Sequence, residues 1–133
     1  MSDLDKYLEY IKSIDSKINR KQYDYDMWFQ TAKGVSSVEF GERVQTSGSK
    51  QKMEYAVARY IEIEKEIVAL LEQKAKFIRL IEQLNENEYE VLHRIYIQGH
   101  SVKDIQRDKE KSYSWVNTMH RRAKRNLAKL KGE

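Results

Sequence analysis

Hydrophobic residues recur every three or four positions along most of the chain, which is the spacing of one face of a helix. In the first third this spacing predicts a helix over Asp3–Lys33, with a narrow apolar seam made of Leu4, Leu8, Ile11, Ile14 and Ile18. Gln51–Leu84 contains no glycine and no proline, which predicts a second helix about 50 Å long. The pattern therefore predicts an all-α protein.

The second helix has a broader apolar face than the first. Two stripes overlap along it, and together they are wider than one neighbouring helix covers. We expect the first helix to lie antiparallel on one side, across a loop at residues 34–50, so that residues 1–84 form a coiled-coil-like helical hairpin. On the other side we expect a second copy of the protein, as a homodimer. The residues predicted to form this partner interface are Tyr60, Ile63, Ile67, Leu70, Leu71, Phe77 and Ile78.

A cluster of aromatic residues lies near the end of the first predicted helix, at Tyr23, Tyr25, Trp28 and Phe29. One interpretation is an aromatic layer that closes one end of the hairpin. The other is an exposed anchor for a protein partner, because tyrosine, tryptophan and methionine are enriched at interfaces. The sequence leaves both interpretations open.

The last third of the chain shows short helices separated by turns. Glu88–Gln98 is predicted to be helical, residues 99–100 form a glycine-containing break, and Val102–Lys109 forms a second short helix. A basic helix follows, with Ser112 as its N-cap. Because this order of elements is typical of a helix-turn-helix DNA-binding domain, residues 85–133 are predicted to form one.

Two further features of this predicted domain follow from its polar and apolar positions. Asn85 with Glu88, or Asn87 with Glu90, has the spacing of a capping box, so either asparagine suits the start of the first helix. The expected core consists of Leu92, Ile95, Tyr96, Val102, Ile105, Val116 and Met119.

Positive charge is concentrated in the last predicted helix. Residues 111–131 include seven lysines and arginines and no acidic residue. Residues 86–133 contain 11 basic and 7 acidic side chains, a net charge of +4, whereas residues 1–85 balance 14 with 14. Such a helix suits a polyanion, since each neutralised phosphate releases condensed counterions. The expected partner is therefore double-stranded DNA.

Individual positions on this helix are assigned from the way recognition helices meet DNA. Exposed side chains of the first turns contact base edges, and neighbouring cations contact phosphates. Asparagine can pair with adenine and arginine with guanine, while tyrosine or threonine can contact a thymine methyl group or a phosphate. The predicted base-facing residues are Tyr113, Ser114, Asn117, Thr118 and Arg121. The predicted phosphate contacts are Lys111, Arg122, Lys124 and Arg125.

The same part of the chain resembles a known family. The run YEVLHRIYIQGHSVKDI at Tyr89–Ile105, SYSWV at Ser112–Val116, RRA at Arg121–Ala123 and Leu127 are similar to region four of bacterial sigma-70-family factors. That domain binds the promoter −35 element. Two departures stand out: Lys109 and Glu110 replace an apolar residue and a glycine, and Tyr113-Ser114-Trp115 replaces arginine and glutamate. The resemblance implies the scaffold and not the standard −35 recognition.

The layout of the whole chain is similar to that of small phage and prophage proteins of Gram-positive bacteria. It has a long helical first half, a loop with Arg43–Ser49 and a sigma-like C-terminal domain. These proteins are related to late-gene transcription regulators of the ArpU and RinA type. The resemblance implies a phage or prophage late-gene activator that recruits bacterial RNA polymerase.

Composition narrows the class of protein further. The chain has 133 residues, no proline, no cysteine and 35% charged residues, which suits a helix-rich protein with a thin core. Three widely spaced histidines and no cysteine predict neither a metal site nor a cofactor. We expect no enzyme, since no catalytic or nucleotide-binding motif appears. No apolar run suggests a signal peptide or a membrane span, so we expect a location in the bacterial host cytoplasm and no membrane partner.

The sequence thus favours a sequence-specific DNA-binding transcription regulator. Two alternatives stay open. In the first alternative, the hairpin is a protein-interaction module for host RNA polymerase or its sigma factor, acting as a decoy or inhibitor. In the second, the basic helix binds nucleic acid without sequence preference, which steep salt dependence would indicate.

Overall fold

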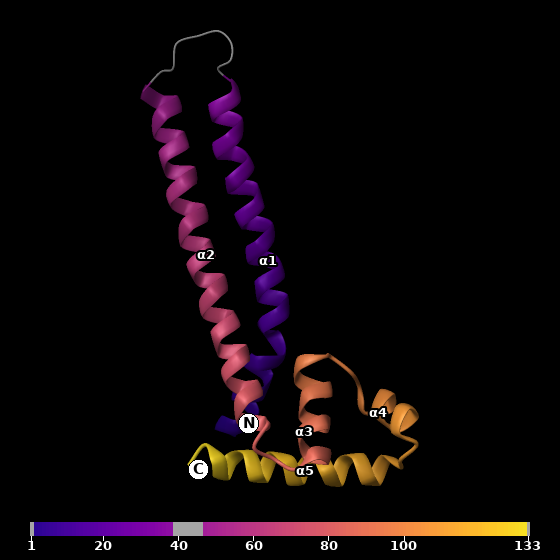
Figure 1. Cartoon of the computed structure of the whole chain (residues 1–133). Helices are drawn as coiled ribbons and strands as arrows, with labels where there is room; N and C mark the ends of the chain where they lie inside the picture. The colour runs from indigo at the N-terminus through magenta and orange to yellow at the C-terminus, as the bar shows by residue number, and fades with distance from the viewer. Residues whose placement is uncertain (1, 39–46, 133) are drawn as a thin grey trace. The chain divides into compact units, whose positions relative to one another are not determined.

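The computed structural model describes the backbone of residues 2–38 and 47–132, and the side chains of residues 2–34 and 50–132. Within this part every regular element is a helix, which confirms the all-α prediction. In chain order the elements are α1 (Asp3–Val38), α2 (Ser47–Ile81), α3 (Glu86–Leu92), the π-helix η1 (His93–Ile97), α4 (Val102–Lys109) and α5 (Tyr113–Leu130) (Figure 1). None of the described helices has the length and apolar character that crossing a membrane requires.

The chain divides into two compact units. The middle unit is Asp15–Leu71, and the terminal unit combines Met1–Ile14 with Glu72–Glu133. The terminal unit is therefore larger than the predicted domain 85–133. A domain of that small size buries little apolar surface and is marginally stable alone, and the added segments contribute more.

Both long helices extend further into the predicted loop 34–50 than the sequence indicated. Residues 34–38 belong to α1 and residues 47–50 to α2, so the loop prediction is wrong at both ends. Adding a residue to an existing helix needs no new nucleation, and glycine or serine costs at most about 1 kcal/mol relative to alanine. The remaining residues 39–46, including Arg43, lie outside the described part of the chain.

In the middle unit, α1 and α2 run side by side (Figure 1). Lys21 Nζ lies 3.0 Å from Glu66 Oε1. The Tyr60 ring packs edge-on against Tyr25 and Phe29, at centroid distances of 5.4 and 5.3 Å. These contacts support the packing interpretation of the aromatic cluster for Tyr25 and Phe29.

The terminal unit begins its short helices at Asn85, which decides between the two possible caps. The Asn85 side chain accepts a hydrogen bond from the Glu88 backbone at 2.9 Å. Glu88 does not complete a capping box, because its carboxylate instead accepts from Asn126 of α5 at 3.0 and 3.1 Å. Local sequence patterns do not reveal this long-range pairing.

The α4 helix has the predicted bounds, and its two ends explain why. Ser101 and Asp104 form a reciprocal capping box at its start. It ends at Glu110, whose φ of 54° lies in the left-handed region. A glycine adopts that conformation without penalty, whereas other residues pay about 1–2 kcal/mol. This is the position at which the sigma pattern has a glycine.

Both α3 and α4 pack against α5 (Figure 1). The core of the terminal unit takes apolar side chains from each of its segments. Of the seven core residues expected from the sequence, six are buried and Val102 is half-buried. The first turns of α1 add buried side chains to the same unit, among them Leu4, Leu8 and Ile11. Tyr7 contacts the fully buried Phe77 of α2 edge-on, at 6.0 Å between ring centroids.

Candidate nucleic-acid interface

The start of α5 is fixed by its cap. The Ser112 hydroxyl accepts a hydrogen bond from the Trp115 backbone at 3.0 Å, which confirms the predicted N-cap. Lys111 lies over the Trp115 ring, with Nζ 5.2 Å from its centroid. Tyr113 is 62% exposed, and Ser114 is exposed beside it. The first turn therefore presents an aromatic ring and a hydroxyl to solvent.

One side of α5 is buried and the other is polar. Val116, Met119, Ala123 and Leu127 form the buried side. The five predicted base-facing residues all lie away from it: Tyr113, Ser114 and Arg121 are exposed, and Asn117 and Thr118 are half-buried. A helix with one such polar side can face a ligand over several turns.

The basic residues of the terminal unit fall into two groups. In the first group each cation has an acidic partner, as in Lys109 with Glu90 at 2.8 Å. The predicted phosphate contact Lys124 belongs to this group, because its Nζ lies 2.6 Å from Asp5 Oδ1 in the first turn of α1. Lys124 is therefore half-buried and already neutralised by an internal carboxylate.

The second group is exposed and unpaired. Arg121, Arg122 and Arg125 are exposed on α5, and none has an acidic partner among the residues that the structure describes. Arg125 lies four positions from Arg121 and three from Arg122, so the three arginines share the polar side of the helix with Ser114 and Thr118. Uncompensated positive charge on one helix face attracts anions.

The α4 helix is held by a buried arginine that sequence reasoning missed. Arg94 of η1 is buried, donates from Nε to His100 Nδ1 at 2.8 Å and pairs with Asp108 of α4. The Arg94 guanidinium, with Arg107, holds the pKa of Asp108 below its ordinary range. The sequence signal for it was an arginine within the largely apolar run VLHRIYI, and helical periodicity does not reveal the partners of such a residue.

A half-buried histidine joins α5 to η1. His120 Nε2 lies 2.8 Å from the Tyr96 hydroxyl, within hydrogen-bond distance. Burial, reinforced by Lys124, lowers the pKa of His120 below its ordinary value of 6.5, while Asp5 opposes the shift. Burial also raises the pKa of Tyr96 to about 12. Burial likewise lowers the pKa of His93.

These shifts predict that stability decreases in mild acid. The unfolded chain binds protons at its histidines near pH 6.5, whereas the folded chain resists them to lower pH, so the free energy of unfolding falls as the pH drops below about 6.5. Urea denaturation at pH 7.5 and pH 5.5 measures the difference. In a His120→Gln variant the difference is expected to shrink. The carboxylates of Asp5, Asp104 and Asp108 add a separate loss only below about pH 4, since their pKa values are lowered from 3.8.

The predicted partner interface on α2 needs correction. Ile63, Leu70 and Phe77 are buried within the single chain, so a second copy cannot contact them without unfolding α2 from its neighbours. Tyr60, Ile67 and Ile78 are half-buried, and of the seven only Leu71 is exposed. Helical spacing located an apolar face but did not say how much of it α1 covers.

Scans of protein-family models, of curated proteins and of solved structures found no match to this chain. The resemblance to sigma region four and to phage regulators therefore stays a prediction. Within the described residues, no three histidine, aspartate or glutamate side chains gather as a possible metal site.

Proposed function

We propose that this protein is a sequence-specific DNA-binding transcription regulator. In this proposal α4, the turn after it and α5 form a helix-turn-helix, with α5 as the recognition helix. The observation that carries the proposal is the unpaired arginine group on the polar side of α5. Lys109 and Lys124 of the same unit are neutralised internally, whereas these three arginines have no acidic partner among the described residues.

The chemistry of the face fits duplex DNA. The major groove is about 12 Å wide and admits an α-helix with its side chains. Ser114, Asn117 and Thr118 can exchange hydrogen bonds with base edges, and Arg121 can pair with guanine. Arg122 and Arg125, further along α5, suit the flanking phosphates, where they fix the register of the helix.

Beyond DNA binding, the proposal draws on the sequence. We propose that residues 1–84 act as a hairpin arm and that the protein is a phage or prophage late-gene activator which recruits bacterial RNA polymerase in the host cytoplasm. These steps rest on the resemblance to sigma region four and to ArpU and RinA-type regulators. The exposed and unpaired side chains of α5 support only the DNA-binding step.

The division between base and phosphate contacts is testable with two variants. Asn117→Ala is expected to relax sequence preference at a cost of about 1–3 kcal/mol, because a base contact is lost. Arg125→Ala is expected to weaken binding to all sequences and to lower the slope of log affinity against log salt by about one. Duplexes selected from a random library supply the specific site, and fluorescence anisotropy over a salt series measures both effects.

Lys124→Ala is the matched control, since Lys124 lies one position from Arg125 but is paired with Asp5. It is expected to change the salt slope less than Arg125→Ala does. Equal losses of Asn117→Ala and Arg125→Ala on specific and random DNA would contradict the assigned roles. Salt-sensitive binding without any selected motif would favour the non-specific alternative.

One observation favours a second candidate, a protein-interaction module for RNA polymerase or its sigma factor. Tyr23 is 71% exposed on α1, and Met27, one helical turn further, is exposed too. Large exposed side chains of these types are common at protein interfaces. Binding of the intact protein to purified polymerase without DNA, abolished by Tyr23→Ala, would support this candidate.

A further inference from the structure

A second apolar seam runs along α2, beside the one that is buried. Ile61, Val68 and Leu71 are 43%, 48% and 48% exposed, although they lie in the interior of a long helix. Four buried residues of α2, at Ala56, Ile63, Leu70 and Phe77, follow a separate line, each one position before Val57, Glu64, Leu71 or Ile78. The exposed seam therefore has no cover within the described part of the chain.

The spacing of the exposed seam is that of a two-stranded coiled coil. Its positions alternate by four and three residues over three heptad repeats, in the order Val57, Ile61, Glu64, Val68, Leu71, Ala75 and Ile78. Only Glu64 interrupts the apolar run. All of these positions belong to one unbroken helix, α2.

From this seam and its charges we infer that α2 pairs with α2 of a second copy, antiparallel, so that Val68 packs against Leu71 of the partner subunit. One edge of the seam carries Lys65, Glu72 and Arg79, seven residues apart. In the inferred register Lys65 lies beside the partner's Glu72, and by symmetry Glu72 lies beside the partner's Lys65. Lys65, Glu72 and Arg79 have no ion-pair partner among the described residues.

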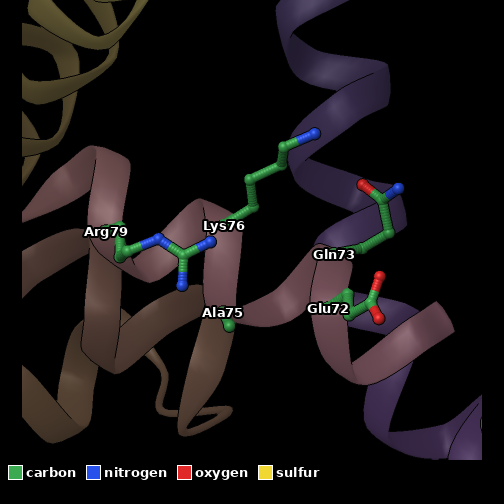
Figure 2. Close-up of a pocket in the computed structure, with 5 residues that line it drawn as sticks. All are labelled: Glu72, Gln73, Ala75, Lys76 and Arg79. Atoms are coloured by element: carbon green, nitrogen blue, oxygen red, sulfur yellow. The ribbon is translucent and has the colours of Figure 1, made fainter. Parts of the chain in front are cut away.

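Glu64, the one polar residue of the exposed seam, also has a complementary site in the inferred register. Figure 2 shows a hollow on α2 in which Ala75 lies between Arg79 and Glu72. The hollow measures about 270 Å³, and Lys76 lines it as well. In the antiparallel register the partner's Glu64 lies opposite Ala75, next to Arg79. The small side chain thus leaves room for the one carboxylate of the seam, close to a cation.

Other arrangements bring like charges together. A parallel, in-register pair places Glu64 against Glu64 of the partner subunit and leaves Lys65 without its complement. Moving the antiparallel register by one heptad places Lys65 beside the partner's Lys65, or Glu72 beside the partner's Glu72. Like charges that face each other across an interface disfavour the pairing, so the charges select one register.

A charge exchange tests the pairing. Lys65→Glu is expected to weaken the dimer at least about tenfold, because two glutamates then face each other at both ends of the symmetric contact. The double variant Lys65→Glu/Glu72→Lys is expected to restore the affinity to within about threefold of the original. Sedimentation equilibrium measures the dissociation constant, and circular dichroism confirms that each variant stays helical. A monomer at all concentrations, or a double variant no better than the single one, would overturn the inference.

Cysteine crosslinking tests whether the paired helices run antiparallel. The chain contains no cysteine, so the introduced cysteines are the only ones that can react. In the antiparallel pair, position 64 of one subunit lies opposite position 75 of the other. Positions 64 of the two subunits lie about 16 Å apart along the helix axis, as do the two positions 75, which is too far for a disulfide. Oxidation of mixed Glu64→Cys and Ala75→Cys chains is therefore expected to give a disulfide-linked heterodimer, and neither variant alone should crosslink. Crosslinking of each variant with itself would show a parallel pair and overturn the inference. Dimerisation needs no DNA, so its failure is distinguishable from a failure of the proposed DNA binding.

Discussion

Removal of residues 1–14 is expected to unfold the terminal unit, including the helices proposed to bind DNA. These residues bury Leu4, Leu8, Ile11 and Ile14, and each such side chain contributes about 1.5–3 kcal/mol when fully buried. Together that equals the whole stability of a typical domain, about 5–15 kcal/mol. The deletion also exposes Phe77 and leaves Lys124 without Asp5.

Two-dimensional NMR of the truncated chain provides the measurement. We expect the amide signals of α3, α4 and α5 to collapse into the narrow range of an unfolded chain, together with loss of DNA binding. Leu8→Ala serves as a graded version and is expected to cost about 2–5 kcal/mol. Lys12→Ala, on the exposed side of the same helix, is expected to cost almost nothing. Dispersed signals after truncation would show that the short helices fold without α1.

Replacement of Asn126 by leucine is expected to cost about 1–3 kcal/mol, which is large for a half-buried asparagine. The reason is Glu88, which is only 1% exposed. Both of its carboxyl oxygens accept from Asn126 Nδ2, so the substitution leaves a buried polar group without this hydrogen bond. Urea denaturation followed by circular dichroism measures the loss of unfolding free energy.

A double variant separates the effect of the lost polar contact on stability from the effect of changed packing. In Glu88→Met/Asn126→Leu both partners are apolar, and a buried polar pair replaced by apolar groups of similar shape is close to neutral. We expect it to recover most of the stability that Asn126→Leu loses. If the double variant is as unstable as the single one, then the site depends on the shape of the side chains and not on the buried carboxylate.

Local features of this chain followed from the sequence. The bounds of α4 and the cap at Ser112 were predictable because a capping side chain and its target lie within three residues of each other. The polar side of α5 was predictable because helical spacing separates it from Val116 and Leu127. The ends of α1 and α2 were not, since glycine and serine only weakly oppose the extension of an existing helix.

Contacts between distant residues decided the rest. Lys124 appeared to be a phosphate contact, but it pairs with Asp5 near the other end of the chain. Arg94 is buried in an otherwise largely apolar run, and it bonds to His100 and Asp108. On α2 the two apolar seams are one position apart, so the spacing alone could not tell which of Leu70 and Leu71 faces inward. Charge and period are local quantities, whereas pairing depends on the fold.

The division of the terminal unit between the two ends of the chain sets the order in which it can fold. Its first segment, Met1–Ile14, leaves the ribosome long before α5 has been synthesised. Contacts of such long sequence separation form slowly, because the intervening loop must close first. The helices α1 and α2 can pair during synthesis, but Leu4 and Leu8 cannot be fully buried until the later segments of the terminal unit have been synthesised. An incomplete chain therefore exposes apolar surface to chaperones and proteases and lacks α5, the helix that we propose binds DNA.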